Sequence, residues 1–121
     1  MMDNKFRITR GKGFHFPIGK YLVSVQFGYG NYCDNYDKIE LEDRKIPCEC
    51  ENAEVAIFEG GMFVTDFILE QMGLKAEGDN IISYATPAFV AKIISYLYNE
   101  MEKSNDWFRN SPSYIKLIPY S

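Results

Sequence analysis

The segment FHFPIGKYLVSVQF, residues 14–27, decides how this chain folds. Its second half alternates in the period-two pattern of a β-strand. The PIGK stretch before that strand has the composition of a turn, because proline presets φ and glycine closes the bend. The segment therefore predicts a β-hairpin. The face expected to meet the core carries Tyr21, Val23, Val25 and Phe27, and the other face carries Leu22, Ser24 and Gln26.

Further strands are predicted downstream of this hairpin. EVAIFE (residues 54–59) is typical of a strand, and the Gly60–Gly61 pair is typical of a two-residue hairpin turn, where both positions need φ > 0. MFVTDF (residues 62–67) is the expected return strand, and Lys38–Leu41 is a possible short strand. The ILEQMG stretch that follows either extends the return strand or forms a short helix stopped by Gly73.

One long helix is expected in the second half of the chain. Thr86 is a natural N-cap, and Pro87 suits the first helical position. Apolar residues then recur at helical spacing and form a stripe that should pack on the sheet. The predicted fold is α+β, with an N-terminal antiparallel β-sheet packed against C-terminal α-helices in one domain, residues 1–121. The stripe consists of Val90, Ile93, Ile94, Leu97 and Met101.

Charge and composition exclude several classes of protein. The formal net charge of −4 argues against general nucleic-acid binding, which needs a basic surface. No apolar run is long enough to span a membrane, and the polar N-terminus lacks the apolar core of a signal peptide. Three cysteines, an odd number, fit reduced thiols in the cytoplasm. Nine acidic residues between Asp34 and Glu59 form either a solvated loop or a patch that meets a partner subunit or mimics the charge of DNA.

The sequence offers little for catalysis or for metal binding. His15 is the only histidine, and none of Cys33, Cys48 and Cys50 opens a recognisable helix that would activate its thiol. A zinc site from these four residues is conceivable, but the usual two-residue gap between paired cysteines is absent. We therefore expect no enzyme activity, no metal and no cofactor, with the cysteines as structural thiols.

Two short stretches are candidates for ligand binding. In FGYGNYCDN (residues 27–35), closely spaced glycines either bring backbone amides toward an anion or serve a tight corner. In WFRN (residues 107–110), Arg109 can grip a phosphate beside aromatic rings, or the segment is a C-terminal anchor. Both alternatives remain open at each place. The predicted ligand-binding residues are Phe27, Gly28, Tyr29, Gly30, Asn31, Trp107, Phe108, Arg109 and Asn110.

The order of four segments resembles a known family. GFHF is followed by VSVQFGYGNYCDN, then AEVAIFE, then a Thr-Pro helix start, across residues 13–97. This order is similar to that of the phage-encoded anti-Thoeris sponge family, whose members show a GFH segment, a VSVQFG-x-GNYC-[DE]-N core and an AEVA-[IW] strand. The chain departs from that pattern at Gly61, where related chains carry a longer aromatic turn, and at ILEQMGLKAE, which looks like an insertion.

The resemblance implies a function. Members of this family capture cyclic ADP-ribose isomers made by TIR-domain proteins and hold them intact, so that the immune effector of the host is not activated. Some also hold cyclic oligonucleotides, and members assemble as homodimers or higher homo-oligomers. The resemblance thus implies a non-catalytic binder in the cytoplasm of an infected bacterium. The alternative is an acidic inhibitor that binds a host defence protein directly, as anti-CRISPR and anti-restriction proteins do.

Overall fold

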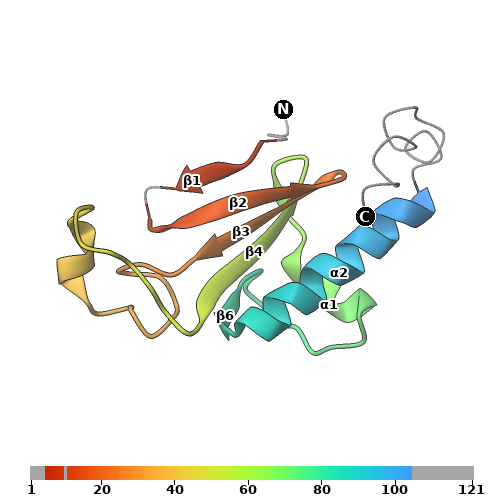
Figure 1. Ribbon diagram of the computed structural model, residues 1–121. Helices are drawn as coiled ribbons and strands as arrows, with labels where there is room; N and C mark the ends of the chain where they lie inside the picture. The colour runs from red at the N-terminus through yellow and green to blue at the C-terminus, as the bar shows by residue number, and fades with distance from the viewer. Residues whose placement is uncertain (1–4, 10, 105–121) are drawn as a thin grey trace.

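The described part of the chain forms a six-stranded antiparallel sheet with two α-helices (Figure 1). The computed structural model describes residues 5–9 and 11–104. The strand order is β1-β2-β3-β4, and both β5 and β6 pair with β4. This arrangement confirms the predicted α+β class. The elements are β1 (Arg7–Thr9), β2 (Gly13–Ile18), β3 (Tyr21–Gln26), the 3₁₀ helix η1 (Ile39–Glu42), β4 (Ala53–Glu59), β5 (Met62–Phe63), α1 (Thr65–Gln71), β6 (Ile82–Ala85) and α2 (Pro87–Ser104).

The predicted hairpin is β2 and β3. Ile18 pairs with Tyr21, so only two residues form the turn, and Gly19 takes the positive φ of 59°. The turn is shorter than PIGK because Pro17 continues β2. Both faces of β3 are buried, since Leu22 lies between Pro17 and Phe58 of the neighbouring strands.

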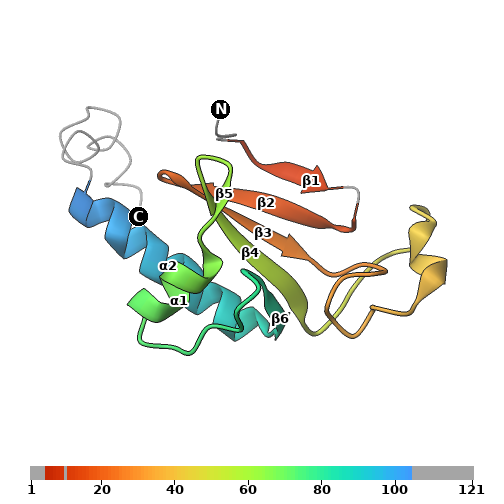
Figure 2. The same cartoon turned by 180° about the vertical axis from the view of Figure 1, so that it is seen from behind.

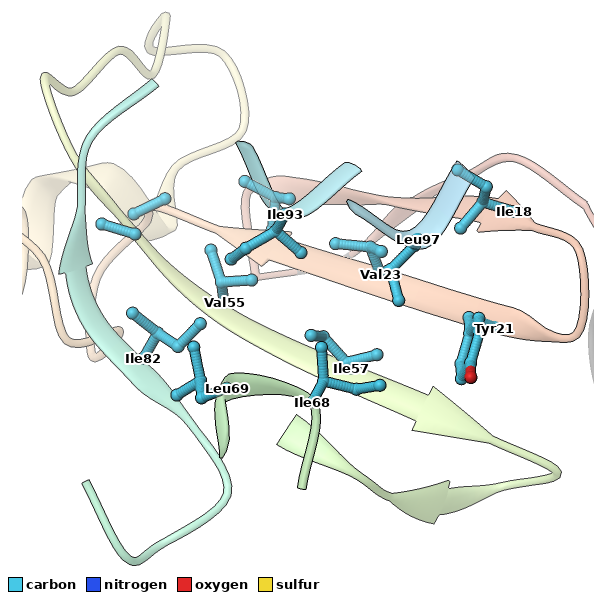
Figure 3. Packing of buried hydrophobic residues seen from close by; sticks show 13 residues of the cluster. Ile18, Tyr21, Val23, Val55, Ile57, Ile68, Leu69, Ile82, Ile93 and Leu97 are labelled. Carbon is cyan, nitrogen blue, oxygen red and sulfur yellow. The ribbon is translucent and has the colours of Figure 1, made fainter. Parts of the chain in front are cut away.

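The core lies between the sheet and both helices (Figure 3). Val23 lies beside Leu97 of α2, and Ile57 lies beside Ile68 of α1. All four side chains are buried. The predicted N-cap is confirmed, because the Thr86 hydroxyl accepts the amide proton of Phe89 at 3.2 Å. The apolar stripe of α2 therefore faces the sheet as expected.

The outer edge of β4 is shared between three segments. β5 pairs with its end, β6 pairs with its beginning, and Thr65 fills the gap between them. The Thr65 hydroxyl accepts the amide proton of Ile57 at 2.8 Å, while the Ile57 carbonyl accepts the amide of Val64 at 2.8 Å. The prediction of a strand over residues 62–67 is wrong beyond Phe63, because the side chain of Thr65 replaces the ladder and the chain turns into α1.

Three other local predictions meet different outcomes. Gly60 and Gly61 form the expected turn with φ of 60° and 83°, and Gly73 follows α1 with φ of 80°. Lys38–Leu41 is not a strand: residues 39–42 form η1, which buries only Leu41. Neither β1 nor β6 was predicted.

Among the described residues, no helix is long and apolar enough to cross a membrane.

Candidate functional site

The long connection between β3 and β4, residues 27–52, forms one end of the molecule (Figure 2). Asn35 links the two ends of this connection. Its buried side-chain amide donates to the Phe27 carbonyl at 2.7 Å and to the Glu49 carbonyl at 3.1 Å. Lys12 fastens its middle, donating from Nζ to the carbonyls of Asp43 and Ile46, both at 3.2 Å. We call residues 27–52 the β3–β4 loop.

Gly28 marks the corner where this loop leaves the sheet. A Cβ at Gly28 would lie 2.4 Å from the carbonyl oxygen of Gly11 and 2.6 Å from the Cβ of Lys12. Two stretches of backbone thus touch at a place that only glycine permits. Gly30 instead supplies a positive φ of 85° in open space.

Most amides of the corner are already hydrogen-bonded inside the molecule. The Gly28 amide donates to Asn31 Oδ1 at 2.8 Å, and the Gly30 amide donates to the Tyr36 carbonyl at 2.9 Å. The Asn31 amide donates back to the Gly28 carbonyl at 3.2 Å, and its side chain donates to Glu54 at 3.0 Å. This pattern favours the tight-corner interpretation for both glycines and for Asn31 over an anion-binding nest.

Tyr29 is the member of the corner that remains available to a ligand. Tyr29 is 38% exposed. Within the described part of the chain, its backbone amide donates no hydrogen bond. A cavity of about 370 Å³ lies beside it, lined also by Lys12, Glu42 and Arg44. The cavity thus combines an aromatic face with two cations and one carboxylate. Gly11 and Leu41 complete the lining.

Arg44 was not predicted as a site residue. In the sequence, Arg44 lies among acidic residues, so its expected role is to offset their negative charge. The 3₁₀ helix η1 and the anchor from Lys12 to the Asp43 carbonyl bring it to the same cavity as Tyr29. Arg44 becomes a candidate because it lies near the FGYG turn. The sequence does not show this proximity, because it depends on how the loop folds back.

The remaining predicted residues fall in different places. Phe27 is partly buried and packs against the core near α2, in a second cavity of about 340 Å³. Trp107, Phe108, Arg109 and Asn110 lie outside the described residues.

The three cysteines are structural in their surroundings. Burial raises the pKa of Cys33, a hydrogen bond with the Asn35 backbone lowers it, and the neighbouring thiols of Cys50 and Cys48 raise it; together they bring it to about 11. Burial also raises the pKa of Cys48, against the opposing charge of Lys12. A thiol with a raised pKa is protonated at neutral pH and is a poor nucleophile. In the part of the chain that the structure describes, no group of histidine, cysteine and acidic side chains is arranged to hold a metal ion.

No protein-family model, curated protein or solved structure matches this chain. The resemblance to the anti-Thoeris sponge family therefore stays a prediction that depends on the motifs quoted above.

Proposed function

We propose that this protein binds and sequesters a cyclic ADP-ribose-type signal without turning it over, in the cytoplasm of an infected bacterium. The observation that carries the proposal is the cavity lined by Tyr29, Arg44 and Lys12. Its volume of about 370 Å³ falls within the usual range of small-molecule pockets.

The chemistry of such a ligand matches these side chains. Adenine offers a flat ring that can stack on Tyr29, and each phosphate can receive two parallel N–H bonds from a guanidinium such as that of Arg44. Lys12 adds positive charge at the wall although its Nζ is bonded to two carbonyls. The acidic net charge of the chain does not oppose binding, because the local potential in the pocket decides.

A binder fits this site better than an enzyme. The raised pKa values of Cys33 and Cys48 disfavour a thiolate nucleophile. His15 lies within the sheet, on β2 between Arg7 and Ser24 in register, while the cysteines belong to the β3–β4 loop. These positions support a protein that holds its ligand intact.

Chain length supports a ligand site shared between two copies. Met101 of α2 lies against Gly19, at the end of β3 opposite to the Gly28 corner. Arg109 follows Ser104 by five residues, which span at most about 17 Å. The six residues of β3 alone extend for roughly 20 Å. Arg109 can therefore join the Tyr29 cavity most readily from a second copy, which supports a homodimer or a higher homo-oligomer.

Capture followed by heat release tests the proposal. Purified protein is mixed with cyclic ADP-ribose isomers, filtered, and then denatured. We expect the filtrate to lose the ligand and heating to return it unchanged, with roughly nanomolar affinity, or about −12 kcal/mol. A returned product would show an enzyme, and a ligand that never leaves the filtrate would reject the proposal.

Two variants locate the site. Arg44→Ala should weaken capture at least about tenfold, the expected loss for one charge-assisted phosphate contact. Lys45→Ala is the matched control, because it removes a neighbouring exposed cation that does not line the cavity. Arg109→Ala should abolish capture if the second copy contributes its guanidinium. Unchanged affinity of the Arg44 variant by calorimetry would move the site away from Tyr29.

The acidic surface of the β3–β4 loop supports a second candidate function. The protein would bind a host defence protein directly and inhibit it, with its carboxylates in place of the phosphates of DNA. Such a protein would leave cyclic nucleotides free in the filtrate and would lose its inhibition in high salt. Seven of its carboxylates are on exposed residues: Asp34, Asp37, Glu40, Glu42, Asp43, Glu49 and Glu51.

A further inference from the structure

An apolar strip on the helix-bearing face of the sheet is left uncovered by the helices. Ile8 pairs in register with Phe14, which pairs with Val25 of the core, so these side chains share one face. Yet Ile8 is 90% exposed and Phe6 is 73% exposed. We call Phe6, Ile8, Phe14 and Phe16 the β1–β2 strip.

The strip continues into a groove along α2. A cavity of about 590 Å³ lies over the four strip residues. Phe14 also lines the cavity of about 340 Å³ that Val90 and Ile94 of α2 close from the other side. Figure 1 shows why the strip is open: β1 is the edge strand of the sheet, on the far side of β2 from β3, and lies away from α2. The result is a mostly apolar surface that runs from β1 to the beginning of α2.

The last turns of α2 lie near one end of this surface. Met101 packs on Gly19 at the turn between β2 and β3. The strip begins nearby, because Phe16 precedes that turn by three residues and its ring contacts that of Phe6 at 5.3 Å between centroids. α2 itself is 18 residues long, or about 27 Å. The 17 residues after Ser104 can extend for more than about 50 Å, enough to return along the whole groove.

The composition of that following segment matches an apolar groove. Residues 105–121 carry only three charged side chains, Asp106, Arg109 and Lys116. We infer that the segment from Trp107 to Tyr120 docks on the β1–β2 strip and the adjoining groove of its own chain. This inference does not depend on the identity of the ligand. With the segment docked on its own chain, Arg109 reaches the Tyr29 cavity of a second copy only where the strip of one copy faces the β3–β4 loop of the other. The large apolar residues of the segment are Trp107, Phe108, Tyr114, Ile115, Leu117, Ile118 and Tyr120.

Trp107 provides the probe, because it is the only tryptophan of the chain. In the full-length protein without ligand, we expect its fluorescence to be blue-shifted and protected from iodide, and independent of protein concentration. Ile8→Lys should shift the emission to the red and raise the iodide quenching constant toward that of free tryptophan. The far-UV circular dichroism should stay unchanged, since Ile8 is 90% exposed among the described contacts.

Matched variants make the test specific. Ile39→Lys is the control for Ile8→Lys, because Ile39 is also an exposed isoleucine, at 61%, but lies on η1 in the β3–β4 loop. It should leave the emission unchanged. The double variant Ile115→Lys, Leu117→Lys should reproduce the shift of Ile8→Lys, and all three substitutions together should add little more.

Three outcomes would overturn the inference. The first is a wild-type emission equal to that of water-exposed tryptophan, and the second is a blue-shifted emission that Ile8→Lys does not change. The third is protection that disappears on dilution, which would show that a second copy supplies the segment. Phe6→Lys, at a 73% exposed position before β1, repeats the test if Ile8→Lys disturbs the strand.

Discussion

The helix-covered part of the sheet and the β3–β4 loop are stabilised in different ways. Under α2, apolar side chains such as Val23 and Leu97 bury one another and leave no exposed area. In the loop, Leu41 is buried, but so are a polar amide, Asn35, and a thiol, Cys33, and these two side chains bond to backbone carbonyls. Burial of apolar area is non-directional, whereas hydrogen bonds demand particular atoms. The loop is therefore the more specific structure and the sheet the more tolerant one.

The largest effect is expected from a cavity in the core. Leu97→Ala should lower the free energy of unfolding by about 4 kcal/mol, because it removes a fully buried side chain between α2 and the sheet. Urea denaturation followed by circular dichroism measures the change. Leu97→Met, which keeps the volume, should cost less than about 1.5 kcal/mol. Equal losses in the two variants would contradict the close packing of α2.

The next effect tests the corner of the loop. Gly28→Val should destabilise the fold by about 3 kcal/mol, because its Cβ would collide with the Gly11 carbonyl and with Lys12. Gly30→Ala is the control: it has open space and suffers only the positive φ, for about 1 kcal/mol. A normal melting temperature for Gly28→Val would disprove the close approach of the two backbones.

A polar deletion sharpens the contrast with the core. Asn35→Ala should cost about 2 kcal/mol, because the Glu49 carbonyl loses its Asn35 donor and the Phe27 carbonyl keeps only the weak Cys48 thiol. Hydrogen exchange should quicken at the loop amides of Gly30 and Tyr36 while the amides of β3 stay protected. If β3 exchanges just as fast, the loop and the sheet are one cooperative unit and the comparison fails.

The smallest effect concerns alkaline pH. The pKa of Cys33 is raised from 9.0 to about 11, so the folded state keeps a proton that the unfolded state releases. Its stabilising contribution is complete below pH 9 and is lost as the pH rises toward 11. Between pH 8 and pH 10 we expect a loss of about 1 kcal/mol. Cys33→Ala should reduce that slope in urea titrations under reducing conditions, and an unchanged slope would assign it to other groups, such as Cys48 or Tyr21.

The sequence predicted the sheet better than the loop for a physical reason. Periodic apolar residues indicate burial directly. The core face predicted for residues 21–27 is confirmed, since Val23 and Val25 belong to the core, although Leu22 on the other face of β3 is buried as well. The stripe through Ile93 and Leu97 is confirmed too. Asn35 carries no such signal, because its importance comes from two distant carbonyls. Arg44 likewise becomes a candidate only when η1 folds back on the FGYG turn.

Short strands were missed for a related reason. β1 and β6 have three and four residues, too few to show a period, and Tyr84 of β6 adopts a positive φ of 54° that no propensity suggests. Residues 62–65 are rich in strand formers, and only the Thr65 hydroxyl bonded to Ile57 ends that pairing. These features depend on tertiary contacts.

The Thr65 hydroxyl also has a consequence for aggregation. The centre of the AEVAIFE strand, VAIF (residues 55–58), is apolar and contains two β-branched residues, a composition that favours intermolecular strand pairing. Its outer edge is covered by β5 and β6 only in part, and Thr65 occupies the amide of Ile57 in the gap between them. The Ile57 amide is therefore not available to pair with a strand of another chain. Thr65 thus acts as a gatekeeper, and replacing it by valine would turn a sealed edge into a template for intermolecular pairing.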